Sequence, residues 1–421
     1  MVQYLKLTTA TLRRLCAVFT LLCFSIVAKA NFTEGSYTFS VNSDGESVTI
    51  TRHDDKNATS IWIPSTAYDS NKEKSYDVTA IGSSVFKNYT KLTSIFWGSV
   101  EVIGSSAFEG CIALTEVNIS GNIKTIGGGA FRNCTALVSL TLNAGLLNIG
   151  SSGNSYGAFE GCKNLTSISL PGTVLNIYRR AFYDCSSLET VNLNDGLLLI
   201  GTNAFYNCAL TSIVIPNSVT DLGEYIFVGC SKLQKAVIGR KVETMGQGNF
   251  RLLKELSDVT IEDGCSVLAN NTFEGCTSLK EISIPGSVKT ISYQAFYKCT
   301  ALREVTLNEG IVNIGTSNNS YGAFEGCTSL SSISLPSTVL NIYRRAFYDC
   351  SSLETVNLND GLLLIGTNAF YNCALTSIVI PNSVTDLGEY IFVGCSKLQK
   401  AVIGGAPGFF RGRSTQTRMT A

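Results

Sequence analysis

Cysteine and histidine are the residue types in this chain best suited to nucleophilic or metal chemistry, and the sequence holds fifteen of the first and one of the second. A thiolate is a nucleophile and a metal ligand, and a Cys–His pair needs the imidazole as its base. No two cysteines form the C-x-x-C pair of a typical metal site. We therefore expect neither a metal centre nor a cofactor.

His53 is the sole histidine, so a catalytic triad, a Cys–His pair or a histidine-rich metal site would have to use it. Asp54, Asp55 and Lys56 follow it and indicate a solvated turn. Neither this segment nor residues 42–45 fits the D-x-[DN]-x-[DN]-G pattern of a calcium loop. We expect no enzymatic activity. Because carboxylates occur widely, a secreted hydrolase with paired acidic groups stays open as a remote alternative.

The cysteines are positioned by a repeat that a phenylalanine marks. The markers are Phe86, Phe108, Phe131, Phe159, Phe182, Phe205, Phe227, Phe250, Phe273, Phe296, Phe324, Phe347, Phe370 and Phe392. Their spacing is nearly constant, except for two longer gaps, Phe131 to Phe159 and Phe296 to Phe324. Both longer gaps carry the same enlargement, near residues 151–156 and 317–321. Such self-similarity is typical of repeat architectures.

Twelve cysteines lie three positions after a marker phenylalanine. Tyr89 and Leu253 replace cysteine at this place in two units, and Cys265 holds the position that Val288 holds in its own unit. Exchange with apolar residues predicts buried free thiols that fill interior space. Disulfides between neighbouring units are one alternative, because export permits oxidation, and metal binding is another.

Residues 279–299 show what one unit contains. The pattern L-x-x-I-x-I alternates as a half-buried strand does, and Pro285 ends the strand because it has no amide hydrogen. Val288 and Ile291 then point back to the interior, and Phe296 and Cys299 close the unit. No stretch is long enough for an independent helix. One unit cannot bury its own apolar face, whereas stacked units share a core.

The signature L-x-x-I-x-[LI]-P-x-x-V-x-x-I-x-x-x-A-F-x-x-C recurs from about Ile81 to Gly404. It resembles the BspA-like, or treponemal-type, leucine-rich repeats. The resemblance implies a curved, right-handed leucine-rich-repeat solenoid that is rich in β-structure with little helix. A parallel sheet would line its concave side, with short strands or 3-10 turns on the other side. It also implies a secreted or cell-surface role, since family members act as adhesins toward host matrix proteins or other cells.

Four segments follow from these patterns. Residues 1–30 are predicted to be a signal peptide, with basic residues, a short apolar run and the cleavage pattern Ala28-Lys29-Ala30. Residues 31–80 are predicted to form an N-terminal β-hairpin cap and a degenerate first repeat, interrupted by a polar insertion at residues 67–76. Residues 81–404 hold about fourteen repeats. Residues 405–421 lack the apolar pattern, and we expect a disordered tail.

A larger duplication overlies the small repeat. Residues 156–239 superpose on residues 321–404, and the two stretches differ at four positions. The differing pairs are Lys163/Thr328, Asn164/Ser329, Thr166/Ser331 and Gly172/Ser337. Duplication lengthens a binding surface or a spacer, whereas a catalytic centre copied whole would be unusual.

The charge balance excludes one class of partner. Of 32 basic and 32 acidic residues, removal of residues 1–30 discards four basic ones, which leaves 28 against 32 and a net charge of −4. No basic block remains, so we expect no nucleic-acid partner. No second long apolar stretch follows, so we expect no transmembrane segment in the mature chain and a location that is secreted or on the cell surface. The sequence does not define the oligomeric state, for which a monomer is the expectation.

The outward residues of each predicted strand are the candidate binding surface. They occupy the third and fifth positions of the L-x-x-I-x-L frame, and most are small and hydroxylated or acidic. The candidates are Phe96, Glu116, Asn118, Ser139, Thr141, Ser167, Thr190, Asn192, Asp258, Glu281, Glu304, Thr355 and Asn357. Phe96 is the one aromatic among them and the best candidate for a hot spot. The alternative is an ordinary solvated strand face.

A second surface feature is the repeated basic pair Arg179-Arg180 and Arg344-Arg345, which would contact an acidic partner or be an ordinary exposed charge. Taken together, these patterns favour an adhesion or recognition protein whose concave face binds an extracellular protein or glycan. A structural stalk or spacer, favoured by the duplication, is the alternative.

Overall fold

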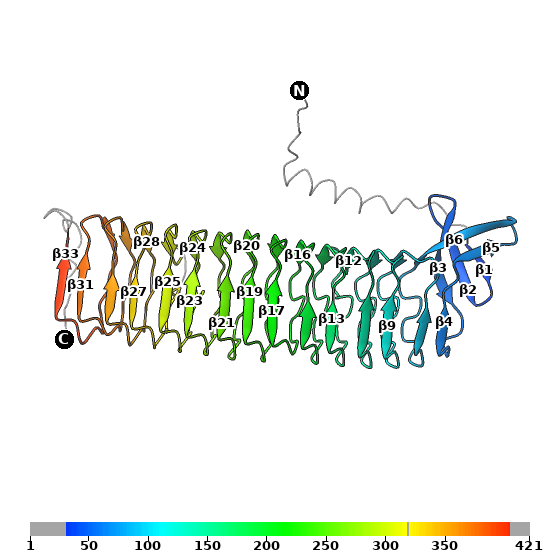
Figure 1. Cartoon of the computed structure of the whole chain (residues 1–421), viewed down its shortest axis with the longest axis horizontal. Coiled ribbons are helices and arrows are strands. Elements are labelled where there is room, and N and C mark those ends of the chain that lie inside the picture. Colours follow the sequence, from blue (N-terminus) through cyan, green and yellow to red (C-terminus); the bar gives the residue numbers. More distant parts are fainter. Residues whose placement is uncertain (1–30, 318–319, 405–421) are drawn as a thin grey trace, which may run out of the picture.

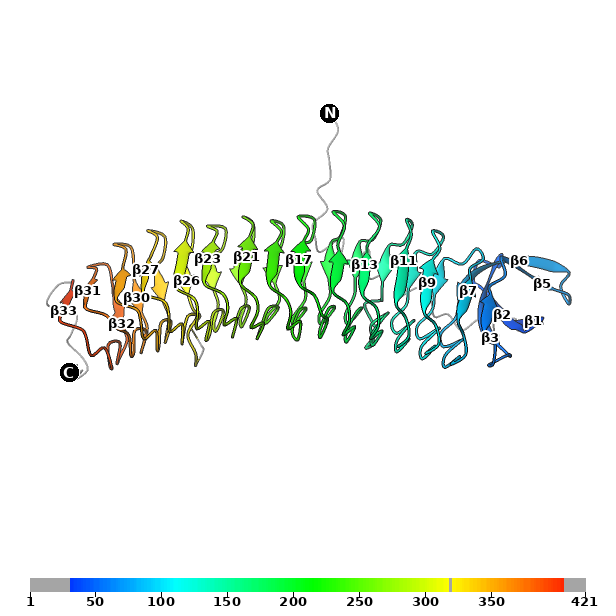
Figure 2. The same cartoon turned by 60° about the horizontal axis from the view of Figure 1, so that its bottom comes forward.

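The computed structural model describes residues 31–317 and 320–404, and all regular elements in this part of the chain are β-strands. Figure 1 shows the strands stacked side by side along one long axis, with β1–β6 at one end and β33 at the other. Figure 2 shows that the stack is gently bowed. The predicted signal peptide (1–30) and the predicted disordered tail (405–421) lie outside the described residues.

Each repeat contributes a longer strand whose side chains alternate between solvent and core, as in β17, where the pattern is exposed, buried, exposed, buried. We call the row of these strands the long-strand face. Its strands are β4 (Ser60–Trp62), β7 (Ser94–Phe96), β9 (Glu116–Ile119), β11 (Ser139–Leu142), β13 (Ser167–Ser169), β15 (Thr190–Asn192), β17 (Ser212–Ile215), β19 (Lys235–Ile238), β21 (Asp258–Ile261), β23 (Glu281–Ile284), β25 (Glu304–Leu307), β27 (Ser332–Ser334), β29 (Thr355–Asn357), β31 (Ser377–Ile380) and β33 (Lys400–Ile403).

The strands of the long-strand face pair in parallel, as the resemblance implied, but their ladder is divided into groups of two or three. Examples are β9 with β11, and β17 with β19 and β21. The break from β11 to β13 falls at the first enlarged unit, and the break from β15 to β17 falls at a unit one residue shorter than its neighbours. Unequal units therefore interrupt the ladder at these two places.

A second row consists of two-residue strands, whose pairing is far more continuous. These are β8 (Val102–Ile103), β10 (Thr125–Ile126), β12 (Asn148–Ile149), β14 (Asn176–Ile177), β16 (Leu199–Ile200), β18 (Asp221–Leu222), β20 (Thr244–Met245), β22 (Val267–Leu268), β24 (Thr290–Ile291), β26 (Asn313–Ile314), β28 (Asn341–Ile342), β30 (Leu364–Ile365) and β32 (Asp386–Leu387). They pair in parallel in two runs, β8 to β20 and β22 to β32. The short strands predicted for the second side are thus confirmed.

The A-F-x-x-C segments form a third hydrogen-bonded row, which we call the turn row. The amide of each marker phenylalanine up to Phe370 donates to a carbonyl of the next unit, as Phe86 does to Ala107 at 2.8 Å. The residue two positions after the marker commonly has a positive φ, as at Asn88 (61°) and Asp184 (58°). Asn, Asp and Gly tolerate this conformation best, and these types dominate the position.

The fourteen marker phenylalanines form one continuous file of rings in the core. Consecutive centroids are 5.0 to 6.1 Å apart, from Phe86 to Phe392, and successive rings are close to parallel. Thirteen of the side chains are fully buried, and Phe392 in the final unit is partly buried. The predicted stacking is confirmed, and it defines the axis of the solenoid.

The thirteen cysteines among the described residues are buried free thiols, as the sequence predicts. The structure adds a reason for the residue type. Each of the twelve repeat thiols donates a hydrogen bond to the carbonyl oxygen of the marker phenylalanine one unit earlier, at 3.1 to 3.3 Å, as Cys134 does to Phe108. A small apolar side chain with one weak donor fits this place, which an alanine or a valine would leave without a donor.

The N-terminal cap covers one end of the stack. β2 (Tyr37–Val41) pairs antiparallel with β3 (Ser47–His53) as the predicted hairpin, and β1 (Asn31–Glu34) adds to its edge. β4 pairs in parallel with β7, the first strand of the following unit on the long-strand face. The polar insertion contributes to a second hairpin, β5 (Thr66–Asp69) with β6 (Lys74–Ile81), and β6 also pairs with β3.

His53 is buried where the cap meets the first unit. Its ring lies between those of Tyr37, Phe86 and Tyr89, and its Nδ1 is 3.3 Å from the Tyr89 hydroxyl, which donates to the carbonyl oxygen of His53 at 2.7 Å. Burial lowers the pKa of His53, against the smaller opposing effect of Asp54 and Asp55. This histidine therefore packs the cap.

Acidification is expected to loosen the cap. Because the pKa of His53 is lower in the folded than in the unfolded chain, the unfolded state takes up the proton more readily, so stability falls as the pH drops through the ordinary histidine pKa of about 6.5 and below it. Hydrogen exchange of β2 and β3 should quicken over this range relative to that of β17, which serves as the internal reference for the pH dependence of exchange itself. In His53→Phe the acceleration should vanish; equal acceleration in this variant would refute the assignment.

Candidate ligand-binding surface

Two exposed aromatic rings stand side by side at the N-terminal end of the long-strand face. Trp62 in β4 is paired with Phe96 in β7, and both occupy the outward position of their strand. The rings stack with centroids 3.9 Å apart and planes 12° apart. Their exposed fractions are 67% and 43%, so the stack leaves much aromatic surface in water. Exposed apolar surface of this kind marks interaction sites.

A shallow hollow with polar groups adjoins this pair. Besides the two rings, Trp97, Asn118 and Asn143 line it. The Trp97 indole Nε1 donates to the carbonyl oxygen of Asn118 at 2.6 Å, and the Asn143 amide donates to Asn118 Oδ1 and to the carbonyl oxygen of Ile119, both at 2.8 Å. The side chains are thus held in place before any ligand arrives. We call Trp62, Phe96 and Trp97 the aromatic platform.

The other predicted surface residues all lie on the long-strand face and are exposed. Asn118 is the one that joins Phe96 at the hollow, while the rest extend along the solenoid in rows. Some interact with neighbours in the same row: Lys235 pairs with Asp258 at 2.7 Å, and the Asn357 amide donates to Ser334 Oγ at 2.9 Å. They form a long polar face, not a pocket.

Neither Trp62 nor Trp97 of the aromatic platform was among the residues predicted from the sequence. The segment Ile61-Trp62-Ile63 was assigned to the strand of a degenerate repeat, and its alternation places Trp62 at the outward position. Had the outward positions of this strand been included among the candidates, Trp62 would have been predicted. Its contact with Phe96 was hidden because β5 and β6 lie between the two strands in the sequence.

The basic pairs are only partly free. Arg179 and Arg344 are exposed. Arg180, in contrast, stacks on Tyr183, with its guanidinium carbon 4.0 Å from the ring centroid, and donates to Glu160 at 3.0 Å. Arg345 makes the same two interactions with Tyr348 and Glu325. One arginine of each pair therefore braces the turn row, which corrects the expectation of two exposed charges.

The cysteine thiols of the repeats, which could act as nucleophiles or metal ligands, are buried in the core. Burial raises the pKa of Cys162 and of Cys299 to about 12, so the nucleophilic thiolate is strongly disfavoured. Within the described ranges, no group of three or more His, Cys, Asp and Glu residues is arranged to hold a metal ion. In the same part of the chain, no helix has the length and apolarity to cross a bilayer.

The stacked phenylalanines and the parallel strand rows define a leucine-rich-repeat β-solenoid. The chain belongs to the family of the BspA type leucine rich repeat region, whose model matches in six copies over residues 68–153, 154–280 and 318–405. This confirms the resemblance read from the signature. No curated protein matches the chain.

Two solved structures share the fold at moderate identity. A leucine-rich repeat protein from Bacteroides ovatus is 27% identical, with a TM-score of 0.61 over 88% of this chain and 99% of that one. A leucine rich cell surface protein from Faecalibacterium prausnitzii is 28% identical, with a TM-score of 0.52 over 91% of this chain and 97% of that one.

Proposed function

We propose that this chain is a ligand-binding protein that acts outside the cell, secreted or held at the cell surface, and engages an extracellular protein or glycan through its long-strand face. The observation that carries the proposal is the exposed stack of Trp62 on Phe96 beside a polar hollow. The similar Faecalibacterium protein is described as a cell surface protein, which supports the location.

The physical case rests on rigidity and on aromatic surface. Trp62 and Phe96 are restrained by their mutual stack, and Trp97 is held by its hydrogen bond to the Asn118 carbonyl oxygen, so less conformational entropy is lost when a ligand binds. Tryptophan is among the residues most often found to dominate binding energy. The polar rows beyond the platform offer hydrogen bonds to an extended ligand. We assign the chain no catalytic step.

Trp62→Ala is expected to weaken binding about 30-fold or more, in line with the loss of about 2 kcal/mol that marks a hot spot. The measurement is a titration of the ligand found by screening purified extracellular-matrix proteins and a glycan array. Val214→Ala is the matched control, because Val214 is 58% exposed in the same row of outward positions and lies far along the solenoid. Binding by Trp62→Ala that equals the parent would contradict the proposal.

A second role, as a spacer, is favoured by one observation: residues 321–404 repeat residues 156–239 with four differences. Deleting residues 240–404 joins Gly239 to Gly405, the same junction that Gly404 makes in the parent chain. If the deleted block only adds length, affinity should be unchanged. If the ligand extends along the whole long-strand face, affinity should fall.

A further inference from the structure

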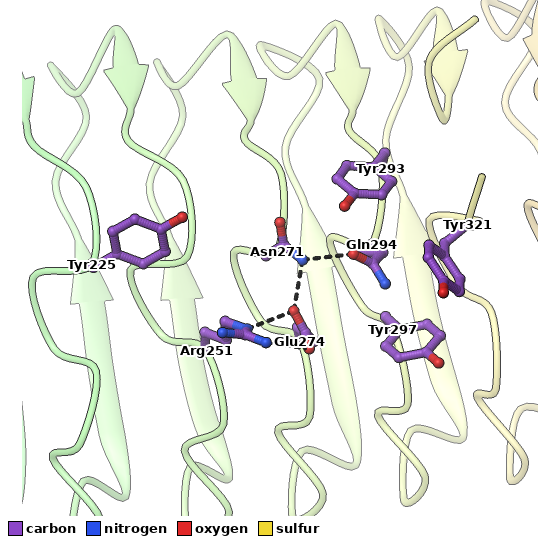
Figure 3. Close-up of a pocket in the computed structure, with 8 residues that line it drawn as sticks. All are labelled: Tyr225, Arg251, Asn271, Glu274, Tyr293, Gln294, Tyr297 and Tyr321. Carbon is purple, nitrogen blue, oxygen red and sulfur yellow. Dashed lines mark hydrogen bonds and ion pairs between the residues drawn. The ribbon is translucent and has the colours of Figure 1, made fainter. Parts of the chain in front are cut away.

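A second hollow lies on the turn row, mostly in the segment 240–320 that separates the two duplicated blocks. Figure 3 shows its eight lining residues, which come from the turns of successive units. They are Tyr225, Arg251, Asn271, Glu274, Tyr293, Gln294, Tyr297 and Tyr321. We call this the tyrosine hollow. It shares no lining residue with the hollow beside the aromatic platform.

The floor of the tyrosine hollow is a connected polar network. Arg251 binds Glu274 with two hydrogen bonds, of 2.7 and 3.1 Å, and the Asn271 amide donates to Glu274 at 2.6 Å and to Gln294 Oε1 at 2.8 Å. Glu274 and Gln294 are only 8% and 7% exposed. The carboxylate is the main cause that raises the pKa of Arg251. The floor is therefore rigid, and its two charges neutralise each other.

Tyrosine rings wall the hollow above this floor. The Tyr297 and Tyr321 rings meet edge to face, with centroids 5.6 Å apart, and Tyr321 is 42% exposed. The Tyr225 hydroxyl accepts a hydrogen bond from the Gln247 amide at 2.7 Å. Tyrosine offers an apolar ring face and a polar hydroxyl together. Figure 3 places Tyr225 on one side of the floor and the other three rings on the opposite side.

The corresponding register of the first half of the solenoid is built differently. Glu109 corresponds to the buried Glu274, but Gly128 and Gly129 stand where Tyr293 and Gln294 stand. Arg132 takes the place of Tyr297 and stacks on Tyr156, 4.0 Å from its ring centroid. The tyrosine walls therefore do not follow from repeat geometry alone. Tyr293 and Tyr297 belong to the units between the blocks.

We propose that the tyrosine hollow is a second ligand site and that it binds a neutral oligosaccharide. A pyranose ring presents C–H groups that pack on aromatic faces and hydroxyls that both donate and accept hydrogen bonds. The hollow offers ring faces together with the amide groups of Asn271 and Gln294. An anionic ligand fits poorly, because Arg251 is already held by Glu274, whose carboxylate would repel it.

The test is a titration of the full chain with neutral oligosaccharides, selected on an array that also carries sulfated and sialylated glycans and extended peptides. The double substitution Y293G/Q294G recreates the Gly128-Gly129 pair of the first half, and glycine suits the positive φ of 55° at Gln294. It should lower affinity about tenfold or more through lost ring contact and hydrogen bonds.

Three further variants separate the explanations. Tyr321→Ala removes an exposed ring without disturbing the core and should also weaken binding. Tyr206→Ala removes a ring of the turn row outside the hollow, stacked on Tyr183 at 4.8 Å, and should change nothing. Trp62→Ala should leave this site intact even where it abolishes binding at the aromatic platform. The proposal is overturned if the parent chain binds no neutral glycan, if it binds only charged glycans or peptides, or if Y293G/Q294G and Tyr321→Ala bind as the parent does.

Discussion

Phe205→Ala is expected to destabilise the centre of the solenoid by about 3–5 kcal/mol, the range for removing a fully buried phenylalanine. The ring is fully buried, and it lies between Phe182 at 5.5 Å and Phe227 at 6.0 Å. The backbone on both sides is hydrogen-bonded from unit to unit, so neighbouring turns cannot close over the gap. The substitution removes two ring contacts and leaves a cavity.

The measurement must respect the geometry of a repeat protein, in which each unit contacts mainly its neighbours and unfolding need not be all-or-none. Hydrogen exchange along the chain should show the loss of protection centred on β16 and β18, with β2 and β3 of the cap far less affected. Tyr206→Ala is the control, because it removes the adjacent but partly exposed ring. A loss below about 1 kcal/mol for Phe205→Ala would show that the file of rings does not carry the stability that burial assigns to it.

The period of the sequence predicted this core, because residues that are one repeat apart occupy equivalent positions in successive coils of a solenoid. Phe205 and Cys208 recur with nearly every unit, and a residue that recurs with every coil faces the same environment in each. The partners of the thiols could not be predicted in the same way. The acceptor of the Cys208 thiol is the backbone of Phe182, and every residue has a carbonyl group, so residue types say nothing about which one accepts.

The candidate binding surfaces, too, could be predicted only in part from the sequence. Phe96 was predicted because its outward strand position follows from the alternation of its own unit. The tyrosine hollow was missed, since Tyr293 and Tyr297 occupy turn positions, where no alternation says which side chains converge. Likewise, Arg180 looked free because its partner Glu160 belongs to the preceding unit. The alternation of residues within one unit predicts which side chains face outward. Contacts between units depend instead on the distance from one coil to the next.

Gly157→Ala is expected to destabilise the unit that follows the first enlarged loop by at least about 3 kcal/mol, which is large for the addition of one methyl group. A Cβ at Gly157 would overlap the carbonyl oxygen of Arg180 in the next unit. This oxygen belongs to the backbone, so no side-chain rotation relieves the overlap. Within its own unit, the Gly157 amide donates to the Glu160 carboxylate at 3.0 Å.

The duplication supplies the matched control for this prediction. Gly172 has no atom within 4 Å of an added Cβ, and the second block carries Ser337 at the corresponding position. Gly172→Ser should therefore change stability by no more than about 0.5 kcal/mol. Urea unfolding and hydrogen exchange of β14 and β16 would compare the two variants. If Gly157→Ala is as stable as Gly172→Ser, adjacent units are not held at the spacing that the turn row requires. The distance between units would then be variable enough to admit the methyl group. The tyrosine hollow would widen as well, because the same contacts between units set the distance between its walls.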